Sequence, residues 1–334
     1  MKTVLVTGGA GYMGSVLVPK LLIGGYQVVV LDTFFFTDLG LKEVKNHPKL
    51  RMIHGDIRDE GILKSSLKGM DAVIHLASIS NDPSSDLNPK LTIEVNFDAT
   101  LKLVKISKDI GVRRLINAST SSVYGIKDTP NVTEDLPLEP LTVYSKTKAD
   151  AEPFVVQAND KNFTAVNIRP ATVCGYSPKM RLDLTVNILT MHALTKGKIT
   201  VFGGGQKRPH IHIEDITDYY MKLLEIPSEK IAGKTFNAGY ENFTVMEIAL
   251  MVKAIVGKNV EIEVTPSNDN RSYHISSAKI ERELGLVPGK TIKDAVQDIK
   301  KASDAGLLDW NNINFYNVKK MTSLMESQAV SISK

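Results

Sequence analysis

Six short stretches, nearly all in the first half of the chain, are either rich in β-branched residues or continuously apolar, rather than apolar at alternate positions. β-Branched residues are frequent in them, and such continuous apolar runs are typical of strands that are buried on both faces of a sheet. The stretches lie at residues 2–7, 27–32, 51–55, 71–76, 113–118 and 163–168.

Longer segments with helical spacing separate these strands. In residues 91–111 a series of apolar side chains is expected to share one side of a helix that Gly111 ends: Ile93, Phe97, Leu101, Val104 and Ile106. Alternation of strand and helix predicts an α/β fold, a Rossmann-type doubly wound parallel sheet.

After about residue 170 this alternation becomes less regular. The Pro- and Gly-rich segments "GYSPKM" and "VFGGGQKRP", followed by a further strand in "TFNAGY", indicate a smaller α/β substrate-binding domain that is interleaved with the first. We expect residues 1–170 with about 212–240 to bind the cofactor, and about 171–211 with 241–320 to bind the substrate. Residues 321–334 are expected to form a flexible tail.

Composition narrows the class of protein. The 334 residues are 43% hydrophobic and 23% charged, as in globular proteins, and the net charge of +4 is dispersed, which argues against binding to nucleic acid or to a membrane surface. A lone cysteine, Cys174 in the apolar stretch "ATVCG", is expected to be a packed thiol. With neither a signal peptide nor a long apolar run, the chain is expected to be cytoplasmic, and no metal site is predicted.

A glycine-rich turn follows the first predicted strand. In "TGGAGYMGS", Gly8, Gly11 and Gly14 are three residues apart and lead into an apolar helix. Such a turn lets the backbone approach a pyrophosphate, and the helix start supplies N–H donors, so we expect Tyr12 and Met13 beside a bound dinucleotide as well. The alternative is a tight turn without a ligand.

Three further strand ends complete the expected cofactor site. Asp32 ends the second strand, where a carboxylate accepts hydrogen bonds from ribose hydroxyls and repels a 2′-phosphate, which favours NAD over NADP. After the third strand, Asp56 is placed to meet the adenine amino group, or else to cap a helix, and Ile57 to pack on the ring. The fourth strand ends in small or apolar residues that leave room for the cofactor: Leu76, Ala77 and Ser78.

The segment "YSKTK" places Tyr144 and Lys148 four residues apart, on the same face of a helix. An ammonium near a phenol favours the phenolate and lowers the tyrosine pKa from about 10, so Tyr144 can act as a general base. A run of hydroxyl residues, "ASTSSVYG" at 118–125, is either the rim of an active site or a strand end that turns into a loop.

Together these motifs resemble the extended short-chain dehydrogenases/reductases, the NAD-dependent epimerases and dehydratases of nucleotide sugars. The resemblance runs from about residue 2 to about 305 and includes "GDI", "HLAS" and "RPHIHIEDI". It implies that Thr120 hydrogen-bonds the reacting sugar oxygen, that Tyr144 is the base, and that Lys148 holds Tyr144 and the nicotinamide ribose. Asn96 matches an asparagine that orders the site through the backbone. A homodimer through helices near 88–111 and 141–160 is also implied.

In the same family the two positions after the catalytic Thr help to decide the reaction. The 4,6-dehydratases have Asp-Glu there, the decarboxylases have Glu at the second position, and the fucose synthase group has Cys at the second position with a His at the position of Ser177. This chain has Ser121 and Ser122. Neither hydroxyl can replace a carboxylic acid, so the resemblance favours a 4-epimerase. A net 4-dehydrogenase or 4-ketoreductase, a 4,6-dehydratase and a non-catalytic dinucleotide-binding protein stay open.

Substrate-binding residues follow from the same resemblance. It implies a set of polar side chains around the nucleotide diphosphate, with Ser121 and Ser122 near the sugar: Asn187, Arg181, Arg208, Arg271 and Tyr273. Arginine suits this task because its forked donors match phosphate oxygens. The segments "RPATV" and "TFFFTDLG" differ from those of UDP-galactose 4-epimerases, so the sugar and the nucleotide base stay open.

Overall fold

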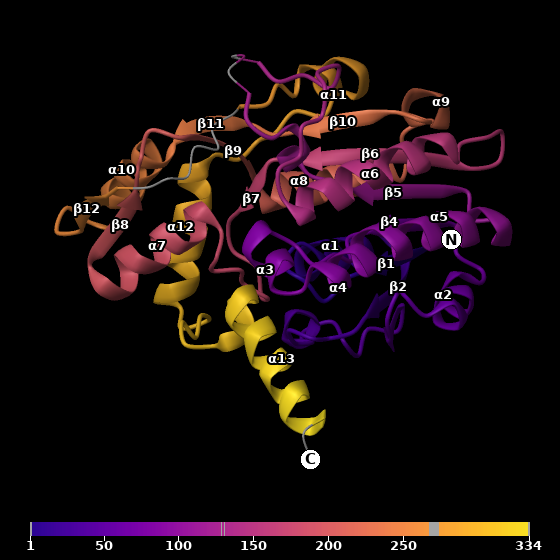
Figure 1. Cartoon of the computed structure of the whole chain (residues 1–334), viewed down its shortest axis with the longest axis horizontal. Coiled ribbons are helices and arrows are strands. Elements are labelled where there is room, and N and C mark those ends of the chain that lie inside the picture. The colour runs from indigo at the N-terminus through magenta and orange to yellow at the C-terminus, as the bar shows by residue number, and fades with distance from the viewer. Residues whose placement is uncertain (1, 128, 130, 267–273, 333–334) are drawn as a thin grey trace.

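The computed structural model describes residues 2–127, 129, 131–266 and 274–332. Within this part of the chain, seven strands form one sheet in the order β10-β6-β5-β4-β1-β2-β3, and all its neighbours pair in parallel (Figure 1). The strands are β1 (Thr3–Thr7), β2 (Gln27–Asp32), β3 (Leu50–His54), β4 (Ala72–His75), β5 (Arg114–Ala118), β6 (Thr164–Pro170) and β10 (Thr235–Ala238). This order is that of a Rossmann-type doubly wound sheet with one further strand, so the predicted fold class is confirmed.

The continuous apolar runs are explained by two hydrophobic cores, one on each face of the sheet. Successive side chains of a strand point to opposite faces, and Val4 and Val6 of β1 belong to one core whereas Leu5 belongs to the other. Neither face of these central strands is left to solvent, so apolar residues are required at every position.

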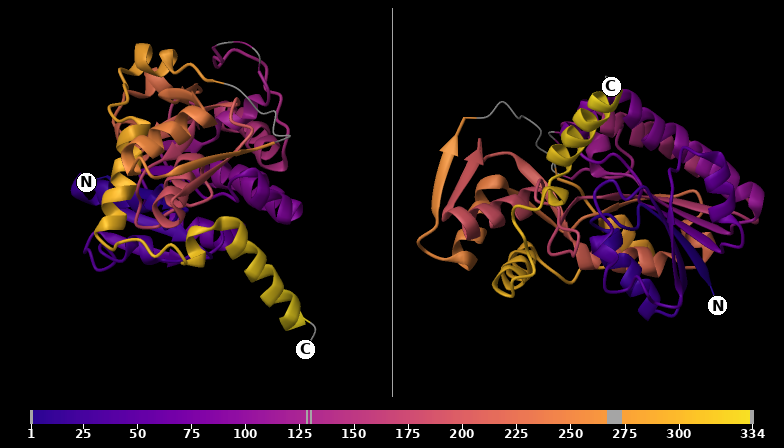
Figure 2. Two further views of the ribbon diagram at one scale, coloured as in Figure 1. Left: turned by 90° about the vertical axis from the view of Figure 1, so that its left-hand side faces the viewer. Right: turned by 90° about the horizontal axis from the view of Figure 1, so that it is seen from below.

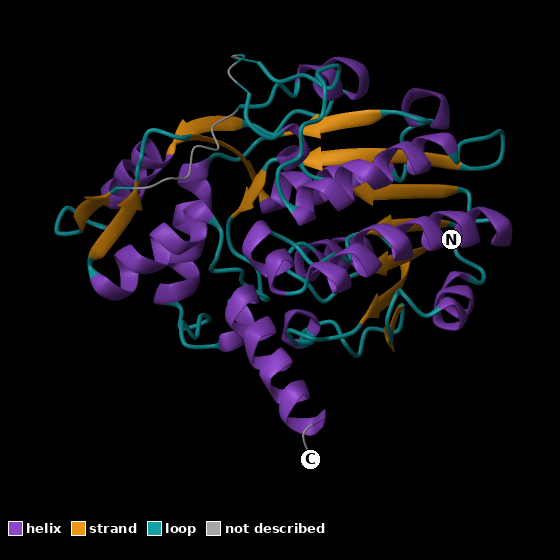
Figure 3. Ribbon diagram, viewed as in Figure 1, coloured by secondary structure: helices purple, strands orange, loops and turns teal. Residues whose placement is uncertain are grey.

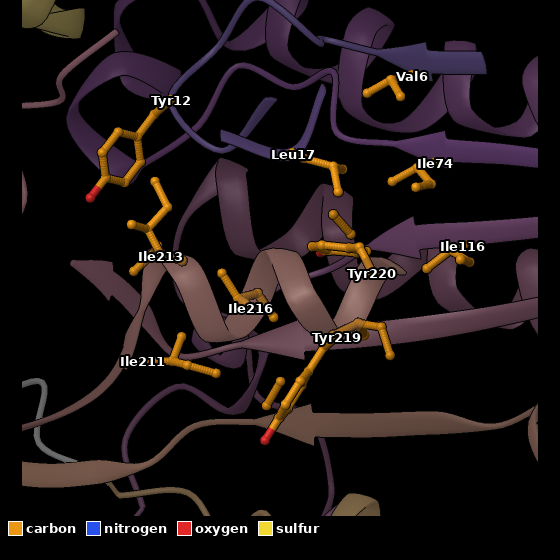
Figure 4. Close-up of a cluster of buried hydrophobic side chains, with 14 of the residues drawn as sticks. Val6, Tyr12, Leu17, Ile74, Ile116, Ile211, Ile213, Ile216, Tyr219 and Tyr220 are labelled. Atoms are coloured by element: carbon orange, nitrogen blue, oxygen red, sulfur yellow. The ribbon is translucent and has the colours of Figure 1, made fainter. Parts of the chain in front are cut away.

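Helices supply the other half of each core. Helices α1 (Gly14–Ile23) and α8 (Ile213–Leu223) pack on one face, and α2 (Glu60–Leu67), α5 (Ala99–Ile110) and α6 (Val143–Gln157) on the other. Figure 4 shows part of the core that α8 shares with the sheet, with Ile216, Tyr219 and Tyr220 of the helix and Val6, Ile74 and Ile116 of the strands. Shorter helices lie at the margins: α3 (Asp82–Leu87), α4 (Pro89–Ile93), α9 (Ser228–Ile231) and α11 (Ala278–Leu284).

A smaller unit lies beyond the carboxyl ends of the sheet (Figures 1 and 3). It contains the sheet β11-β9-β7 and the parallel pair β12-β8, with a core of its own that includes the buried thiol of Cys174. Its elements are β7 (Thr172–Cys174), α7 (Thr185–Lys196), β8 (Lys198–Phe202), β9 (Lys207–His212), β11 (Glu241–Thr244), α10 (Val245–Val256), β12 (Glu261–Thr265) and α12 (Ile292–Asp304).

The chain passes repeatedly between the two units. It enters the smaller unit after β6, returns through α8 to β10 at the edge of the large sheet, and leaves again at β11. Residues 241–320 do not all stay in the smaller unit, in contrast to the expectation from the sequence. Ile280 and Leu286 are buried in the core of the large sheet, because α11 packs against β10.

The helix expected over residues 91–111 is interrupted. A π-helical turn at Glu94–Asp98 separates α4 from α5, and Gly111 ends α5 in the left-handed conformation as expected. A π turn inserts extra rotation into a helix, so one regular stripe cannot continue through it. Ile93 is therefore 44% exposed, whereas Asn96 is fully buried.

The C-terminal segment also differs from expectation. Residues 317–332, of which 321–332 were expected to belong to a flexible tail, form helix α13 (Asn317–Ile332), which begins against α3 and projects from the body of the protein (Figure 2). Buried apolar residues hold its start in place: Phe315, just before the helix, and Met321 in its second turn.

Candidate active site

A cavity of about 480 Å³ lies at the carboxyl ends of the parallel strands, on the side of the smaller unit. In doubly wound sheets this edge is where ligands bind, close to the point at which the strand order reverses. Here the reversal falls between β1 and β4. Residues from both units line the cavity, from the glycine turn at one side to Thr172, Arg181 and Arg208 at the other.

The glycine turn presents bare backbone to this cavity. Gly8 has φ +70°, and a Cβ there would lie 2.6 Å from the backbone N of Ala77; a Cβ on Gly14 would lie 2.3 Å from the carbonyl oxygen of Gly9. Side chains are thus excluded where the turn meets the start of α1. Tyr12 and Met13 line the cavity too, and the hydroxyl of Tyr12 donates to the carbonyl of Gly175 at 2.7 Å. This is a cradle that a dinucleotide pyrophosphate fits.

Asp32 ends β2 at the same cavity. Its carboxylate accepts hydrogen bonds from the backbone N–H of Ala10 at 3.0 Å and of Phe34 at 2.9 Å, which fix its orientation. Burial raises the pKa of Asp32, although the backbone hydrogen bonds and the positive charge of Lys179 act to lower it. This oriented carboxylate is suited to the hydroxyls of a ribose.

Asp56 and Ile57 line the cavity after β3. The carboxylate of Asp56 is paired with Arg58 at 2.7 Å, and although burial opposes it, the hydrogen bonds from Arg58 lower its pKa. Arg58 also binds Glu94 at 2.7 Å, in the π-helical turn. Arg58 is thus a partner of Asp56 within the protein. If Asp56 also binds adenine, as the sequence predicts, its carboxylate must accept hydrogen bonds from both groups.

The end of β4 contributes Leu76, Ala77 and Ser78 to the cavity wall. Asn96 does not line the cavity but lies behind it: its side-chain oxygen accepts from Ser78 Oγ at 3.0 Å and from the N–H of Ile79 at 2.9 Å, and its amide donates to the carbonyl of Ile79. The buried asparagine thus fixes the loop that follows β4.

Thr120, Tyr144 and Lys148 all line the cavity. Thr120 caps the short turn Ser121–Tyr124, its hydroxyl accepting from the N–H of Ser122 at 3.2 Å, and Tyr144 lies in the first turn of α6. Lys148 is buried, and its Nζ donates to the carbonyl of Ala118 at 2.9 Å. Burial lowers its pKa to about 8, although the charge of Glu152 opposes the shift.

A buried ion pair that the sequence analysis missed supports this group. Glu152, one turn after Lys148, binds Arg169 of β6 at 2.6 Å and accepts from Ser119 Oγ at 2.5 Å. Arg169 in turn donates to the hydroxyl of Tyr124 at 2.6 Å. The pair therefore holds both ends of the hydroxyl run that contains Thr120. The signal in the sequence was a carboxylate four residues after Lys148, which by itself is common on helices.

The predicted substrate residues are brought together only in part. Ser121, Ser122, Arg181 and Arg208 line the cavity. Arg181 is paired with Asp183 at 3.0 Å and donates to the carbonyl of Ser80 at 3.1 Å.

Asn187 lies behind the cavity rather than on its wall. It is fully buried, and its amide donates to the hydroxyl of Tyr12 at 3.1 Å and to the carbonyl of Arg181 at 2.9 Å. The structure thus places Asn187 as a support for two residues of the wall. Arg271 and Tyr273 lie outside the described residues.

Lys179, Phe36 and Asn317 also line the cavity, at the side of Asp32. The sequence analysis did not select them, because they come from three distant segments that carry no motif. Among the described residues, no His, Cys, Asp and Glu side chains gather in a group of three or more that could hold a metal ion. No helix in the described ranges is long and apolar enough to cross a membrane.

Comparison with known proteins places these features in a family. The profile of the NAD dependent epimerase/dehydratase family matches residues 4–239. UDP-glucose 4-epimerase of Lactobacillus helveticus is 30% identical over 311 residues, which cover 85% of this chain and 92% of that protein.

Two solved structures show how far the similarity extends in three dimensions. UDP-glucuronic acid 4-epimerase of Bacillus cereus, in complex with UDP-glucuronic acid and NAD, superposes with a TM-score of 0.80 at 28% identity, over 90% of this chain and 99% of that one. The dTDP-glucose 4,6-dehydratase DesIV of Streptomyces venezuelae, with NAD bound, gives 0.81 at 27% identity, over 90% and 97%.

Proposed function

The chain belongs to the NAD dependent epimerase/dehydratase family, as an NAD-dependent enzyme of the extended short-chain dehydrogenase/reductase type, and within that family we propose that it is a nucleotide-sugar 4-epimerase. The observation that carries the proposal is the composition of the wall beside Thr120, where Ser121 and Ser122 line the cavity. Elimination of water needs a carboxylic acid and a carboxylate at the sugar, and these two positions supply hydroxyls.

The carboxylates elsewhere on the wall are engaged in other contacts. Asp183 binds Arg181 at 3.0 Å and accepts from the amide of Asn81 at 2.8 Å. Asp82 accepts from the hydroxyl of Thr142 at 2.6 Å. These bonds support a structural role for both carboxylates at the mouth of the cavity, rather than one in protonating a leaving group.

NAD, held between the glycine turn and Asp32, supplies a hydride acceptor and donor for carbon 4 of the sugar. In the proposed mechanism the phenolate of Tyr144 removes the proton of the C4 hydroxyl as the hydride leaves C4. Thr120 donates a hydrogen bond to the same oxygen. Tyr144 would give the proton back to that oxygen as the resulting 4-keto sugar is reduced on its opposite face, so the reaction would have no net oxidation.

Lys148 acts on Tyr144 by its charge in this proposal. A buried ammonium next to a phenol favours the phenolate, and the structure fixes the ammonium through the carbonyl of Ala118. The pKa of about 8 means that this charge is retained at neutral pH and lost above it.

The nucleotide diphosphate is proposed to bind where the two units meet. Arg181 and Arg208 line the cavity and are the proposed phosphate ligands. Diphosphate binding by Arg271 and Tyr273 stays a prediction from the sequence. We assign the sugar nucleotide to the smaller unit and NAD to the large sheet.

The protein is further proposed to be a homodimer. Apolar side chains lie exposed along α4, the π-helical turn and α6, among them Ile93 at 44% and Phe154 at 47%, and the ring of Phe97 packs edge-on against Phe154 at 5.8 Å. A second copy of the same helices would bury this face, as is usual for two-fold symmetric contacts.

The reaction is tested by proton NMR of the purified protein with NAD and a panel of sugar nucleotides. UDP-glucose, UDP-glucuronic acid and dTDP-glucose are the first three, because the similar proteins carry these names. We expect a new C4 epimer without a rise in absorbance at 340 nm. Accumulation of NADH with a 4-keto product would show a net dehydrogenase instead, and a 4-keto-6-deoxy product would show a dehydratase.

The role of Tyr144 is tested by Tyr144→Phe. Loss of a general base is expected to lower kcat by roughly 10²- to 10⁴-fold, while NAD content stays the same because the ring is kept. Tyr240→Phe is the matched control, since Tyr240 is exposed and outside the cavity wall. Full activity of Tyr144→Phe would contradict the mechanism.

A further inference from the structure

Three segments that are far apart in the sequence meet at the side of the cavity where Asp32 lies. They are the loop after β2, with Phe35 and Phe36; the start of the smaller unit, with Lys179; and the first residues of α13, with Asn317 and Val318. Each of these residues lines the same cavity as the glycine turn. The C-terminal segment is therefore part of the cavity wall.

Lys179 joins the three segments. Its side chain is only 2% exposed, its Nζ donates to Oδ1 of Asn317 at 3.0 Å, and the same nitrogen lies 4.6 Å from the centre of the Phe36 ring. Asn317 is itself buried. One ammonium thus contacts the loop after β2 and the C-terminal helix at once.

The C-terminal segment is anchored on both sides of Asn317. Before it, the carbonyl of Phe315 accepts from the N–H of Leu182 at 2.8 Å, and the Phe315 ring is buried. After it, the side chain of Met321 is buried. These anchors hold Asn317 against Lys179 by packing that does not depend on the polar contact.

The charges at this end suit the ribose of a dinucleotide. Asp32 and Asp183 attract the ammonium of Lys179, Arg181 repels it, and burial lowers its pKa to about 7. A carboxylate on one side accepts hydrogen bonds from ribose hydroxyls, and an ammonium on the other donates to their oxygens. An ammonium has three N–H donors, so binding to Asn317 leaves Lys179 the chemical capacity to bind a ligand as well.

We propose that Lys179 and Asn317 belong to the NAD site at its adenosine end, and that the C-terminal segment 312–321 retains the cofactor throughout the catalytic cycle. The inference rests on the NAD site and deepens the proposed epimerase function. Hydride that is taken from C4 must return from the same cofactor molecule, so an epimerase that released NADH in mid-cycle would leave a keto sugar behind.

The test is the rate at which NAD leaves the intact protein, measured by stopped-flow displacement of bound NADH with excess NAD and by the NAD content after gel filtration. Asn317→Ala and Lys179→Met, which keeps the packing against Phe36, are expected to raise the dissociation rate by roughly ten- to a hundredfold. The matched controls are Asn311→Ala and Lys319→Met, at exposed positions just before and within the same segment. They are expected to behave as the parent chain.

Dissociation rates equal to the parent's, in variants that keep its melting temperature, would overturn the proposal. A second measurement does not depend on variants: NAD added to the cofactor-free chain is expected to slow amide hydrogen exchange across residues 312–321. Unchanged exchange there would overturn the proposal as well. Neither readout involves sugar turnover, so failure of the epimerase assay and failure of this inference are separable.

Discussion

Burial shifts the pKa of His75 and Lys148 downward, and the two residues are close enough for the charge of Lys148 to act on the imidazole. His75 is held between the hydroxyls of Thr7 at 2.6 Å and Thr100 at 2.9 Å, and its pKa falls to about 3. The imidazole is therefore neutral at every pH at which the enzyme is expected to work. The side chain of His75 is part of the buried packing of the protein.

This burial predicts a loss of stability in acid. The pKa of His75 lies below the value of 6.5 expected in the unfolded chain, so the unfolded state binds more protons as the pH falls from 6.5 toward 3. Between pH 6.5 and 4.5 this group is expected to cost roughly 2–3 kcal/mol of the free energy of unfolding.

Urea titrations at several pH values measure this dependence. In His75→Gln, whose amide can bind both threonines, the free energy of unfolding is expected to change less steeply with pH between 6.5 and 4.5. The comparison variant is His54→Gln, because His54 is exposed. An unchanged slope in His75→Gln would show that the imidazole does not resist protonation in the folded state.

At the level of single elements, the first turn of α6 determines where Tyr144 lies. Thr142 and Ser145 form a capping box at this turn, and the hydroxyl of Thr142 also donates to Asp82 at 2.6 Å. An equivalent capping box, Thr244 with Glu247, starts α10 in the smaller unit. Both capping boxes stabilise the start of a helix, but only the one at α6 lies beside the proposed base, Tyr144.

Thr142→Val and Thr244→Val are each expected to lower the free energy of unfolding by about 1 kcal/mol, because both lose an N-cap. Only Thr142→Val is expected to lower kcat, roughly tenfold or more, since small displacements of reacting groups are costly. Thermal melts and kcat on the same samples separate the effects. Equal kcat in both variants would contradict a role of this cap in placing Tyr144.

An element can be predicted from the sequence when the interactions that form it involve residues close together in the chain. Strands β1, β2 and β4 to β6 were predictable because burial on both faces requires apolar residues in sequence, and the glycine turn because no side chain fits there. Strand β3 lies at one edge of the sheet, and Arg51 and His54 are exposed there, so the expected burial on both faces was wrong for this strand. The π-helical turn could not be predicted from local sequence, because the burial of Asn96 depends on its hydrogen bonds to a loop seventeen residues away.

The parts of the site that were missed share a long-range origin. Glu152 and Arg169 meet only after β6 has paired beside β5, and Lys179 meets Asn317 across 138 residues of chain. No spacing rule connects such partners. The proposed catalytic pair, in contrast, could be predicted to share one face of a helix, because fixed helix geometry relates Tyr144 to Lys148.

For the whole molecule, the exposed apolar face on α4 and α6 predicts assembly. Light scattering after size exclusion is expected to give twice the chain mass of 36.7 kDa. Phe154→Glu is expected to give monomers, because it places a charge in the proposed contact. Phe202→Glu, at a 59% exposed ring on β8, is expected to stay dimeric. A monomeric parent chain would contradict the dimer.

The position of β10 at the edge of the large sheet also has a consequence for biosynthesis. Strand β6 ends at Pro170, but its outer partner β10 begins only at Thr235. At ordinary translation rates, roughly 3–13 s pass before the 64 intervening residues have been made. Throughout that interval the nascent chain presents an unpaired hydrophobic strand edge, the kind of surface at which chains aggregate or chaperones bind. The large sheet, to which we assign NAD, therefore cannot be completed on the ribosome until the first elements of the smaller unit, from β7 to β9, have been translated.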